Sequence, residues 1–356
     1  MVNKYYYDIV NDNKIYVALK EFCIANPKMS IEKKFIKACS DNNILVAKYL
    51  NDKYKINIHA NNEKAFRRAC KKGRLEIAKW LYLLGNETGF SINIHAGNEE
   101  AFRWTCEKRH LEVAKWLHKK GIELDSPINI HADNEYAFRW TCEKGHLEIA
   151  KWLHLLGNEI NSPINIHADN EFAFGWACRE GHLEITKWLH MLGNEIGSPI
   201  NIHADNETAF RWSCYYGHLK VANWLYKKSI ELDSSIDIHA NNEGAFRCAC
   251  SNGNLEIAKW LYKLGIEMNS PINIHAYNEF AFRWSCENGH LKVANWLYKL
   301  GIEMNSSIDI HANDKYAFRW SCLNGRLEVT KWLCTLCNKY NINIDSKTNK
   351  IEYRIE

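Results

Sequence analysis

The chain has 356 residues, of which 46 are Lys or Arg and 42 are Asp or Glu, so its formal net charge is only +4. This near balance argues against a strongly basic nucleic-acid-binding protein and against an acidic disordered tail. With 46% hydrophobic and 25% charged residues, the composition is that of a globular protein. No stretch approaches the roughly 18 apolar residues of a membrane span, and the first residues lack the apolar core of a secretory signal. We therefore expect a soluble, intracellular protein.

A pentapeptide of the form Ile-(Asn/Asp)-Ile-His-Ala recurs eight times at intervals of 36 residues. Its histidines are His59, His95, His131, His167, His203, His239, His275 and His311. A near-constant block follows each copy, and a weaker block at Phe35–Leu50 precedes the first. A fixed period of this length indicates a stack of like units that bury their apolar faces against one another. We expect about nine repeats over residues 31–340, the first of them degenerate.

Each repeat is predicted to be a helix, a turn, a second helix and an extended loop. In one copy, Asp133 or Asn134 can cap a short first helix. Gly145 then supplies a left-handed turn, and residues 149–156 carry apolar side chains at the i, i+3, i+4, i+7 spacing of an antiparallel second helix. In the preceding repeat Arg109 stands where Gly145 stands, so we expect Arg109 to be strained.

The two ends of such a stack need different residues, because a terminal repeat has one unpaired face. Residues 1–30 are expected to form an N-terminal helical cap, with a helical stretch around residues 15–25. At the other end, residues 342–344 and 351–355 alternate in polarity on either side of a polar turn, as the strands of a hairpin do. Residues 341–356 are therefore predicted to form a C-terminal β-hairpin-like cap.

The run C-E-K-G-H-L-E-I-A-K-W-L at Cys142–Leu153 resembles the inter-helix turn and second helix of the ankyrin repeat. The resemblance covers residues 31–340 and implies an all-α repeat solenoid, an ankyrin-like stack of helix-turn-helix units with hairpin-like loops. It also implies a concave side that binds other proteins. The chain departs from the family in its period of 36 residues. It also has x-Ala-Phe-Arg, as at Tyr136–Arg139, where the family has Thr-Pro-Leu-His.

The sequence motif I-H-A-D-N-E-x-A at Ile130–Ala137 is similar to motifs in ankyrin proteins from giant, mimivirus-like DNA viruses. This resemblance implies a viral origin and says nothing about a partner. We expect a viral protein that acts on host factors, in the host cytoplasm or alternatively in the nucleus or the virion. A helical repeat that binds nucleic acid is the alternative function. Pentatricopeptide repeats read RNA through variable polar side chains, whereas the variable positions here are often aromatic or aliphatic.

Nine of the thirteen cysteines occupy one position of the first helix. Equivalent positions on stacked helices lie about 8–10 Å apart, whereas a disulfide needs Cα atoms closer than about 7 Å. We therefore expect these thiols to be buried and all thirteen to be free. Cys334 and Cys337 form a lone C-x-x-C with no second pair of ligands nearby in the sequence, so no zinc site is expected.

The sixteen histidines also follow the repeat, with eight in the pentapeptide, five in the inter-helix turn and three at the ends of second helices. One imidazole per stacked unit cannot converge on a single metal ion. A catalytic constellation should occur once and break the repeat locally, and the sequence contains no such set. We expect no catalytic residues, no metal site and no cofactor.

Charged and tryptophan residues are periodic as well. In six repeats a glutamate precedes an arginine by four residues, as Glu135 precedes Arg139, which predicts helical ion pairs. Gly175 interrupts the arginine row, and Lys315 replaces the last glutamate. Of fourteen tryptophans, eight lie on second helices and six on first helices. Their spacing predicts packing between repeats for all of them, with Trp152 buried.

Positions that differ between repeats are where a repeat protein can specify a partner. One such position runs Lys64, Glu100, Tyr136, Phe172, Thr208, Gly244, Phe280, Tyr316. Exposed aromatic side chains are enriched at the centres of interfaces. We expect a protein-binding surface that contains Tyr136, Phe172, Tyr215, Tyr216, Tyr277, Phe280 and Tyr316. The alternative is that some of these rings are packed between loops.

Overall fold

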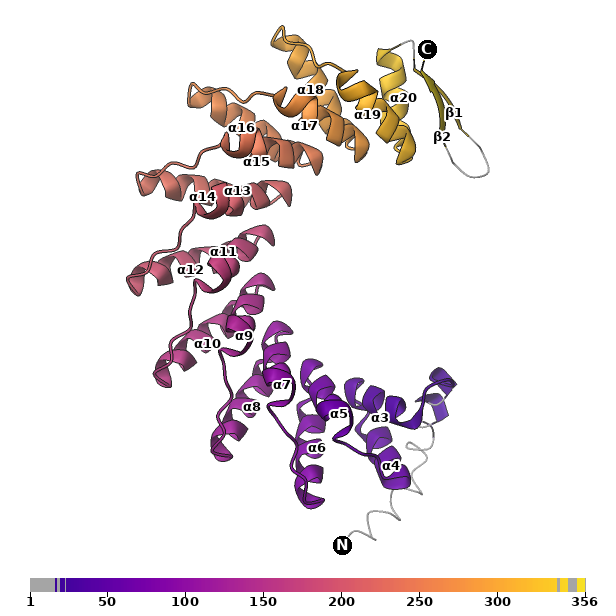
Figure 1. The fold of residues 1–356 in the computed structure, drawn as a ribbon, viewed down its shortest axis with the longest axis vertical. Helices are drawn as coiled ribbons and strands as arrows, with labels where there is room; N and C mark the ends of the chain where they lie inside the picture. The colour runs from indigo at the N-terminus through magenta and orange to yellow at the C-terminus, as the bar shows by residue number, and fades with distance from the viewer. Residues whose placement is uncertain (1–16, 18–19, 23, 338–339, 345–350, 356) are drawn as a thin grey trace. The chain divides into compact units, whose positions relative to one another are not determined.

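The computed structural model describes residues 17, 20–22, 24–337, 340–344 and 351–355 (Figure 1). In the region predicted to form an N-terminal cap, residues 17, 20–22 and 24–25 are helical. Residues 1–16, 18–19 and 23 of that region lie outside the described residues. Within the described part of the chain, no helix combines the length and the apolar character that crossing a membrane requires. The chain divides into two compact units, Met1–Ala168 and Asp169–Glu356.

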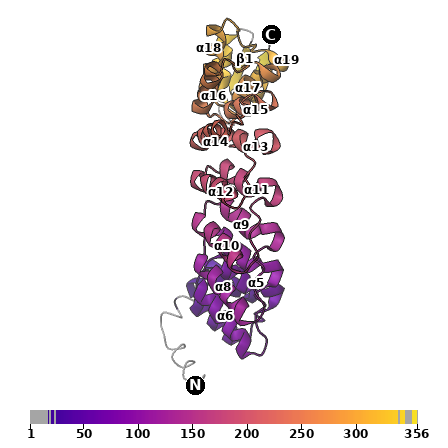
Figure 2. The same cartoon turned by 90° about the vertical axis from the view of Figure 1, so that its left-hand side faces the viewer.

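Both units are built from pairs of helices, with an odd-numbered first helix and an even-numbered second helix in each repeat. The first unit contains α3 (Ile31–Ser40), α4 (Ile44–Tyr54), α5 (Ala60–Lys71), α6 (Leu75–Glu87), α7 (Ala96–Glu107), α8 (Leu111–Glu123), α9 (Ala132–Glu143) and α10 (Leu147–Glu159). The second unit contains α11 (Ala168–Arg179), α12 (Leu183–Glu195), α13 (Ala204–Tyr215), α14 (Leu219–Glu231), α15 (Ala240–Ser251), α16 (Leu255–Glu267), α17 (Ala276–Glu287), α18 (Leu291–Glu303), α19 (Ala312–Leu323) and α20 (Leu327–Leu336). Within each unit, the first helices form one layer and the second helices the other (Figure 2).

The core follows from the apolar face of each helix, as the spacing predicts. Phe102 of α7 and the cysteine one turn later, Cys106, are fully buried. The ring of Phe102 lies 6.1 Å from that of Trp152, which belongs to the second helix of the next repeat. The same phenylalanine–tryptophan contact recurs at Phe35–Trp80, Phe66–Trp116, Phe210–Trp260, Phe246–Trp296 and Phe282–Trp332. The prediction that Trp152 is buried is wrong: the indole is half-buried, and it packs against the fully buried ring of Phe102.

The inter-helix turn is confirmed as left-handed. Gly145 has φ 81°, while Arg109 and Asn42 both have φ 64°, so the two repeats without glycine at this turn adopt the same backbone. The residue after the turn connects neighbouring repeats, since Nε2 of His146 lies 3.1 Å from the carbonyl oxygen of Glu107. Asn254 makes the equivalent bond, with its Nδ2 donating to the carbonyl of Tyr215 at 2.5 Å.

The start of each first helix differs from the prediction. Asp133, Asn134 and Glu135 have φ values of 61°, 56° and 59°, so three consecutive residues are left-handed before the right-handed helix begins. Asp133 and Asn134 therefore do not act as helix caps, and His131 occupies that position without a side-chain cap bond. The same left-handed triplet starts every first helix from α5 to α19. The triplet turns the side chain of Glu135 toward His131 and the loop of the next repeat.

A two-stranded sheet follows the last repeat. β1 (Tyr340–Ile344) pairs antiparallel with β2 (Ile351–Ile355), where the alternating residues predict strands. β1 lies beside α20 and β2 beside α19. The ring of Tyr353 meets that of the buried Phe318 edge-on, with the ring centres 5.7 Å apart. The strands thus cover the apolar end of the last repeat, while the predicted turn at residues 345–350 lies outside the described residues.

Candidate functional site

The arginine row binds the backbone of the left-handed triplet. In α7, Nε of Arg103 donates to the carbonyl of Asn98 at 2.8 Å, and Nη2 donates to the carbonyl of Gly97 at 3.1 Å. Arg67, Arg139, Arg211, Arg247 and Arg283 each donate to the same two carbonyls of their own triplets. In α7 the predicted glutamate–arginine ion pair is wrong. The triplet turns Glu99 toward His95 and the next loop, while the guanidinium of Arg103 bonds the carbonyls of the triplet.

The glutamates form a buried row of their own. Glu135 is only 6% exposed. Its Oε1 lies 2.8 Å from Nδ1 of His131 and accepts the backbone N–H of Asn165, one repeat further on, at 3.1 Å. The other nitrogen of His131 lies 2.9 Å from Oγ of Ser162. The network therefore connects the loops of consecutive repeats through a single carboxylate.

This serine–histidine–glutamate order matches the hydrogen-bond order of a hydrolase triad. It recurs, however, at Ser234–His203–Glu207, Ser270–His239–Glu243 and Ser306–His275–Glu279. In each copy the carboxylate is buried and also holds a backbone amide of the next loop. We assign to this network the structural role of joining repeats. Across the part of the chain that the structure describes, no group of three or more His, Cys, Asp or Glu side chains could hold a metal ion.

One aromatic cluster lies in the first unit, around Tyr136. This half-buried ring stacks on Trp140 at 5.4 Å, and the guanidinium of Arg103 lies 4.7 Å from its centre. The hydroxyl of Tyr136 donates to Oε2 of Glu107 at 2.9 Å. Burial, together with this bond to a carboxylate, raises the pKa of Tyr136 well above its ordinary value. The side chain is therefore held in place before any partner binds.

In the second unit, Phe172, Tyr215 and Tyr216 come together. Phe172 stacks on Trp176 with the ring centres 5.0 Å apart. The guanidinium of Arg179 lies 4.0 Å from the Trp176 ring centre and 4.6 Å from that of Tyr216. Arg179 also donates from Nη2 to the Tyr216 hydroxyl at 2.8 Å, and Tyr215 meets Tyr216 edge-on at 4.9 Å. Of the three predicted residues in this cluster, Tyr216 is the most accessible, with 38% of its surface exposed.

The remaining three predicted residues form a second cluster in the same unit. Tyr277 is 55% exposed, and the guanidinium of Arg247 lies 4.3 Å from its ring centre. Arg247 lies 4.7 Å from Phe280, which stacks on Trp284 at 5.0 Å. Tyr316 stacks on the same indole at 6.4 Å. Phe280 and Tyr316 are half-buried, so packing against tryptophan and exposure to solvent coexist in these rings.

The sequence analysis did not predict that the tryptophans of the first helices lie at the surface. Trp104, Trp140, Trp176, Trp212, Trp284 and Trp320 are half-buried or exposed and do not fill the core. Each lies four residues after the variable position, so a ring at one position can stack on the indole at the next turn. This four-residue spacing is the feature of the sequence from which the stacked surface pairs could have been predicted. These tryptophans, the variable aromatics and the adjoining arginines are called the first-helix face below.

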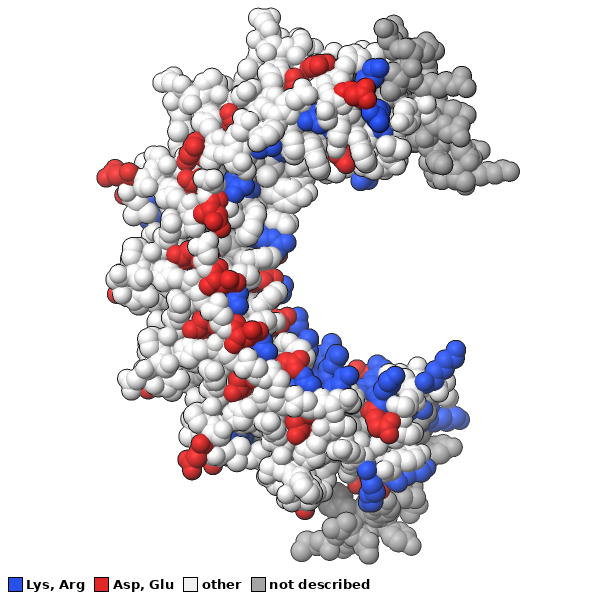
Figure 3. Space-filling model, in the orientation of Figure 1, with Lys and Arg blue, Asp and Glu red and all other residues white. Residues whose placement is uncertain are grey.

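Charge is unevenly distributed over the first unit. Basic side chains gather around α3 and α5 (Figure 3). On α5, Arg67 forms an ion pair with Glu100, and Nζ of Lys71 lies 3.8 Å from the ring centre of Trp104. Arg68 and Lys72 are exposed. Arg67 and Lys71 thus contact other residues of the chain, whereas Arg68 and Lys72 face solvent.

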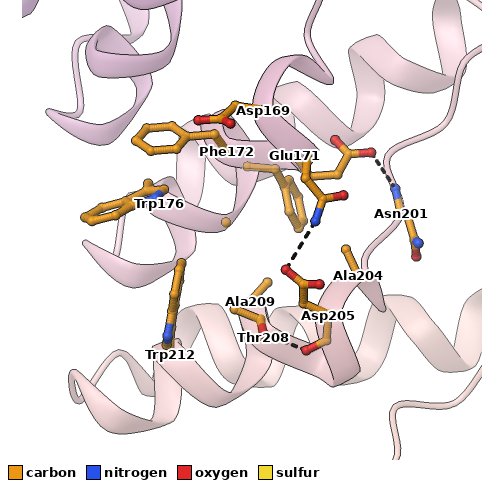
Figure 4. Close-up of a pocket in the computed structure, with 13 residues that line it drawn as sticks. Asp169, Glu171, Phe172, Trp176, Asn201, Ala204, Asp205, Thr208, Ala209 and Trp212 are labelled. Carbon is orange, nitrogen blue, oxygen red and sulfur yellow. Dashed lines mark hydrogen bonds between the residues drawn. The ribbon is translucent and has the colours of Figure 1, made fainter.

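The first-helix face is hollowed where the arginine row is interrupted. A pocket of about 140 Å³ lies between α11 and α13, next to Gly175. The rings of Phe172, Trp176 and Trp212 line one side of it (Figure 4). The carboxylate of Asp205 lies on the other side, where its Oδ2 accepts a bond from Asn170 at 3.1 Å.

Comparison with known protein families gives one consistent result. A model of ankyrin repeats in three copies matches residues 138–236 and 232–308, and a model of ankyrin repeats in many copies matches residues 101–154. Together these ranges cover more than half of the chain. None of the curated proteins compared with the chain matches it.

Ankyrin repeats generally act as protein–protein interaction modules, and the proteins that contain them are typically non-catalytic scaffolds. The stacked helix pairs agree with the family matches, while the 36-residue period is a departure from the family pattern. The chain belongs to the ankyrin repeat family.

Proposed function

We propose that this chain is a non-catalytic scaffold that binds a protein partner through the first-helix face. The observation that supports this most directly is the pairing of aromatic rings with arginines on that face, as at Tyr277 and Arg247. Aromatic and arginine side chains dominate the binding energy of protein interfaces. Because stacking already holds most of these rings, little side-chain entropy is lost when a partner binds.

The test uses two exposed tyrosines whose counterparts in other repeats are asparagines. Asn241 stands at the position of Tyr277, and Asn252 stands at the position of Tyr216. The variant Tyr216→Asn/Tyr277→Asn therefore keeps residues that the repeat accepts, including the left-handed φ of 56° at position 277. If both rings contact the partner, a partner captured by the full chain should bind this variant at least about tenfold more weakly.

A matched control is available on the second helices. Leu155 of α10 is 58% exposed and lies outside the first-helix face, so Leu155→Ala should leave binding unchanged. If the double variant retains the parent's affinity while Leu155→Ala reduces it, the partner binds elsewhere and the proposed surface is wrong. The half-buried Tyr136 and Phe172 are poorer probes, because removing them also removes packing on tryptophan.

Nucleic-acid binding is the second candidate, and the exposed Arg68 and Lys72 of α5 favour it. A phosphate-dominated interaction should weaken steeply as salt rises, whereas an interface centred on aromatic rings should not. Fluorescence anisotropy with labelled single-stranded RNA at two salt concentrations separates the two functions. Salt-sensitive RNA binding that is lost in Arg68→Ala/Lys72→Ala would favour this alternative.

We further propose that the partner is a host protein met in the host cytoplasm. The similarity of the sequence motif at Ile130–Ala137 to motifs in giant-virus ankyrin proteins supports a viral origin. Affinity capture with the tagged full chain from host cytosol, followed by mass spectrometry, tests this proposal. The same capture with the Tyr216→Asn/Tyr277→Asn variant identifies proteins bound through the first-helix face, and the absence of any such protein would contradict the proposal.

A further inference from the structure

The repeats define a binding site for a guanidinium group, and most copies fill it from within the chain. In α7 the guanidinium of Arg103 bonds two carbonyls of its own triplet. It also bonds the following repeat, with Nη1 donating to Oδ2 of Asp133 at 2.6 Å. The ring of Tyr136 lies 4.7 Å away. In α7 the site thus consists of two carbonyl oxygens, a carboxylate and an aromatic ring. The two carbonyls recur in the other arginine-containing repeats, whereas a carboxylate at the position of Asp133 recurs only at Asp169 and Asp205.

In α11 the residue at this position is Gly175, so no arginine of that helix occupies the site. A backbone carbonyl and a carboxylate are present as in α7, whereas Thr208 stands where α7 faces the ring of Tyr136. Asn170 provides the carbonyl that corresponds to that of Asn98, and Asp205 provides the carboxylate that corresponds to that of Asp133. Both residues line the pocket of about 140 Å³, whose volume exceeds the roughly 10–15 Å³ that one water needs. Thr208 lines the pocket at a position where four other repeats have tyrosine or phenylalanine, and its small side chain leaves that side of the pocket open.

The glycine is not required by the backbone or by its neighbours. Gly175 does not have the positive φ that favours glycine, and a β-carbon there would lie 3.8 Å from the nearest atom, Cζ3 of Trp212. Glycine also destabilises the interior of a helix relative to alanine. Neither local geometry nor helix stability therefore accounts for glycine at this position.

We propose that this pocket binds an arginine side chain of the protein partner. The inference rests on the proposed protein-binding function and adds the chemistry that the partner must present. A guanidinium offers five N–H donors in a plane, which suits a carbonyl and a carboxylate on adjacent edges of the pocket. Its face can stack on the rings of Trp176 and Trp212, whose centres are 5.6 Å apart.

A lysine would suit the pocket less well. Its ammonium is a compact point charge that cannot bond the carbonyl of Asn170 and the carboxylate of Asp205 with one planar group. An uncharged citrulline has nearly the same shape as arginine but lacks the charge that the carboxylate stabilises. These two side chains therefore serve as matched ligands that separate geometry from charge.

The test measures binding of N-acetyl-arginine methylamide to the full chain by saturation-transfer NMR. The matched lysine and citrulline amides should bind about tenfold more weakly or not at all, because charge-assisted bonds to Asp205 are lost or misaligned. Free arginine is a further ligand. If only free arginine binds and the capped form does not, the site serves a small molecule and the proposal for a protein side chain is overturned.

Three variants test whether the ligand binds in the pocket. Gly175→Arg restores the residue of the other repeats and should abolish binding while the fold is kept, as circular dichroism and thermal melting would show. Asp205→Asn removes the carboxylate charge and should weaken binding about tenfold. Arg103→Gly should open an equivalent site in the first unit and raise the number of bound ligands from one to two. Equal affinity of the parent and Gly175→Arg for the capped arginine would overturn the proposal.

The outcomes also separate this inference from the proposed function. If capped arginine does not bind but a captured partner depends on Tyr216 and Tyr277, the scaffold function holds and the arginine pocket is wrong. If capped arginine binds the pocket but no captured protein depends on the first-helix face, the pocket stands as a guanidinium site and the scaffold function is wrong.

Discussion

The buried carboxylate of Glu99 should be one of the strongest contacts between two neighbouring repeats. Glu99 is 6% exposed, and its Oε1 meets Nδ1 of His95 at 2.8 Å and the backbone N–H of Asn129 at 3.1 Å. Bonds to a charged group contribute about 1.5–3 kcal/mol each, and a buried donor left unpaired costs a further ~1–3 kcal/mol. Since relaxation and water recover part of this loss, we expect Glu99→Ala to lower the free energy of unfolding by about 3 kcal/mol.

Amide hydrogen exchange can locate this loss. Protection of the Asn129 amide should fall in Glu99→Ala, whereas the amide of Asn93, which bonds Glu63 at 3.3 Å, should be affected less. Urea unfolding gives the total change. Alanine keeps a β-carbon, so the strain of the left-handed backbone at position 99 stays the same and does not confuse the comparison.

Two further variants control for charge and for surface effects. Glu99→Gln retains an oxygen for the Asn129 amide but loses the charge, so it should cost about half as much as alanine. Glu112→Ala removes a glutamate whose side chain is 77% exposed, and it should change stability by less than about 0.5 kcal/mol. If Glu99→Ala is no more destabilising than Glu112→Ala, the carboxylate does not join the repeats as argued.

Three other predictions concern the turn, the thiols and pH. Arg109 has φ 64°, so Arg109→Gly should stabilise the fold by about 1–2 kcal/mol in thermal melting, and a lower melting temperature would contradict the turn assignment. A thiol reagent in denaturant without reductant should titrate all thirteen cysteines, since twelve are free in the described part of the chain, and eleven or fewer would reveal a disulfide. Burial lowers the pKa of His110 below 6.5, so the unfolded chain takes up the proton first and stability should fall as pH drops below that value. The variant His110→Asn introduces the residue that Asn254 provides at the equivalent turn. It should reduce the loss of unfolding free energy between about pH 7 and 5 in urea unfolding, and an unchanged pH dependence would refute the assignment.

The repeat period and the apolar spacing were sufficient to predict the helix pairs. Phe138 and Cys142 lie one turn apart, and both are fully buried. Gly145 marks the end of the first helix because few other residues adopt positive φ without strain. These predictions depend on local sequence and on burial, and neighbouring repeats reinforce both.

The left-handed triplet could not be predicted in the same way. Asn and Asp tolerate positive φ, so Asp133 and Asn134 carried a weak signal, but Glu135 has no such preference. Contacts outside the triplet stabilise it, namely those of Glu135 with His131 and with the loop of the next repeat. A helical wheel assumes right-handed residues throughout, and it therefore placed the glutamate next to Arg139.

Gly175 replaces an arginine of the other repeats, whereas Gly244 stands at the variable position, and the structure gives the two glycines different roles. A β-carbon on Gly244 would lie 3.0 Å from Cδ of Arg211 and 3.2 Å from Cβ of Asn241, so this glycine makes room for an arginine of the chain itself. A β-carbon on Gly175 would meet nothing closer than 3.8 Å. Gly175→Ala should therefore stabilise the chain by roughly the ~1 kcal/mol that alanine gains over glycine in a helix. Gly244→Ala should gain less or destabilise, because the Arg211 side chain must move. Urea unfolding of the two variants measures the difference, and equal stabilisation would show that Gly244 is not needed for close packing and that the two positions are equivalent.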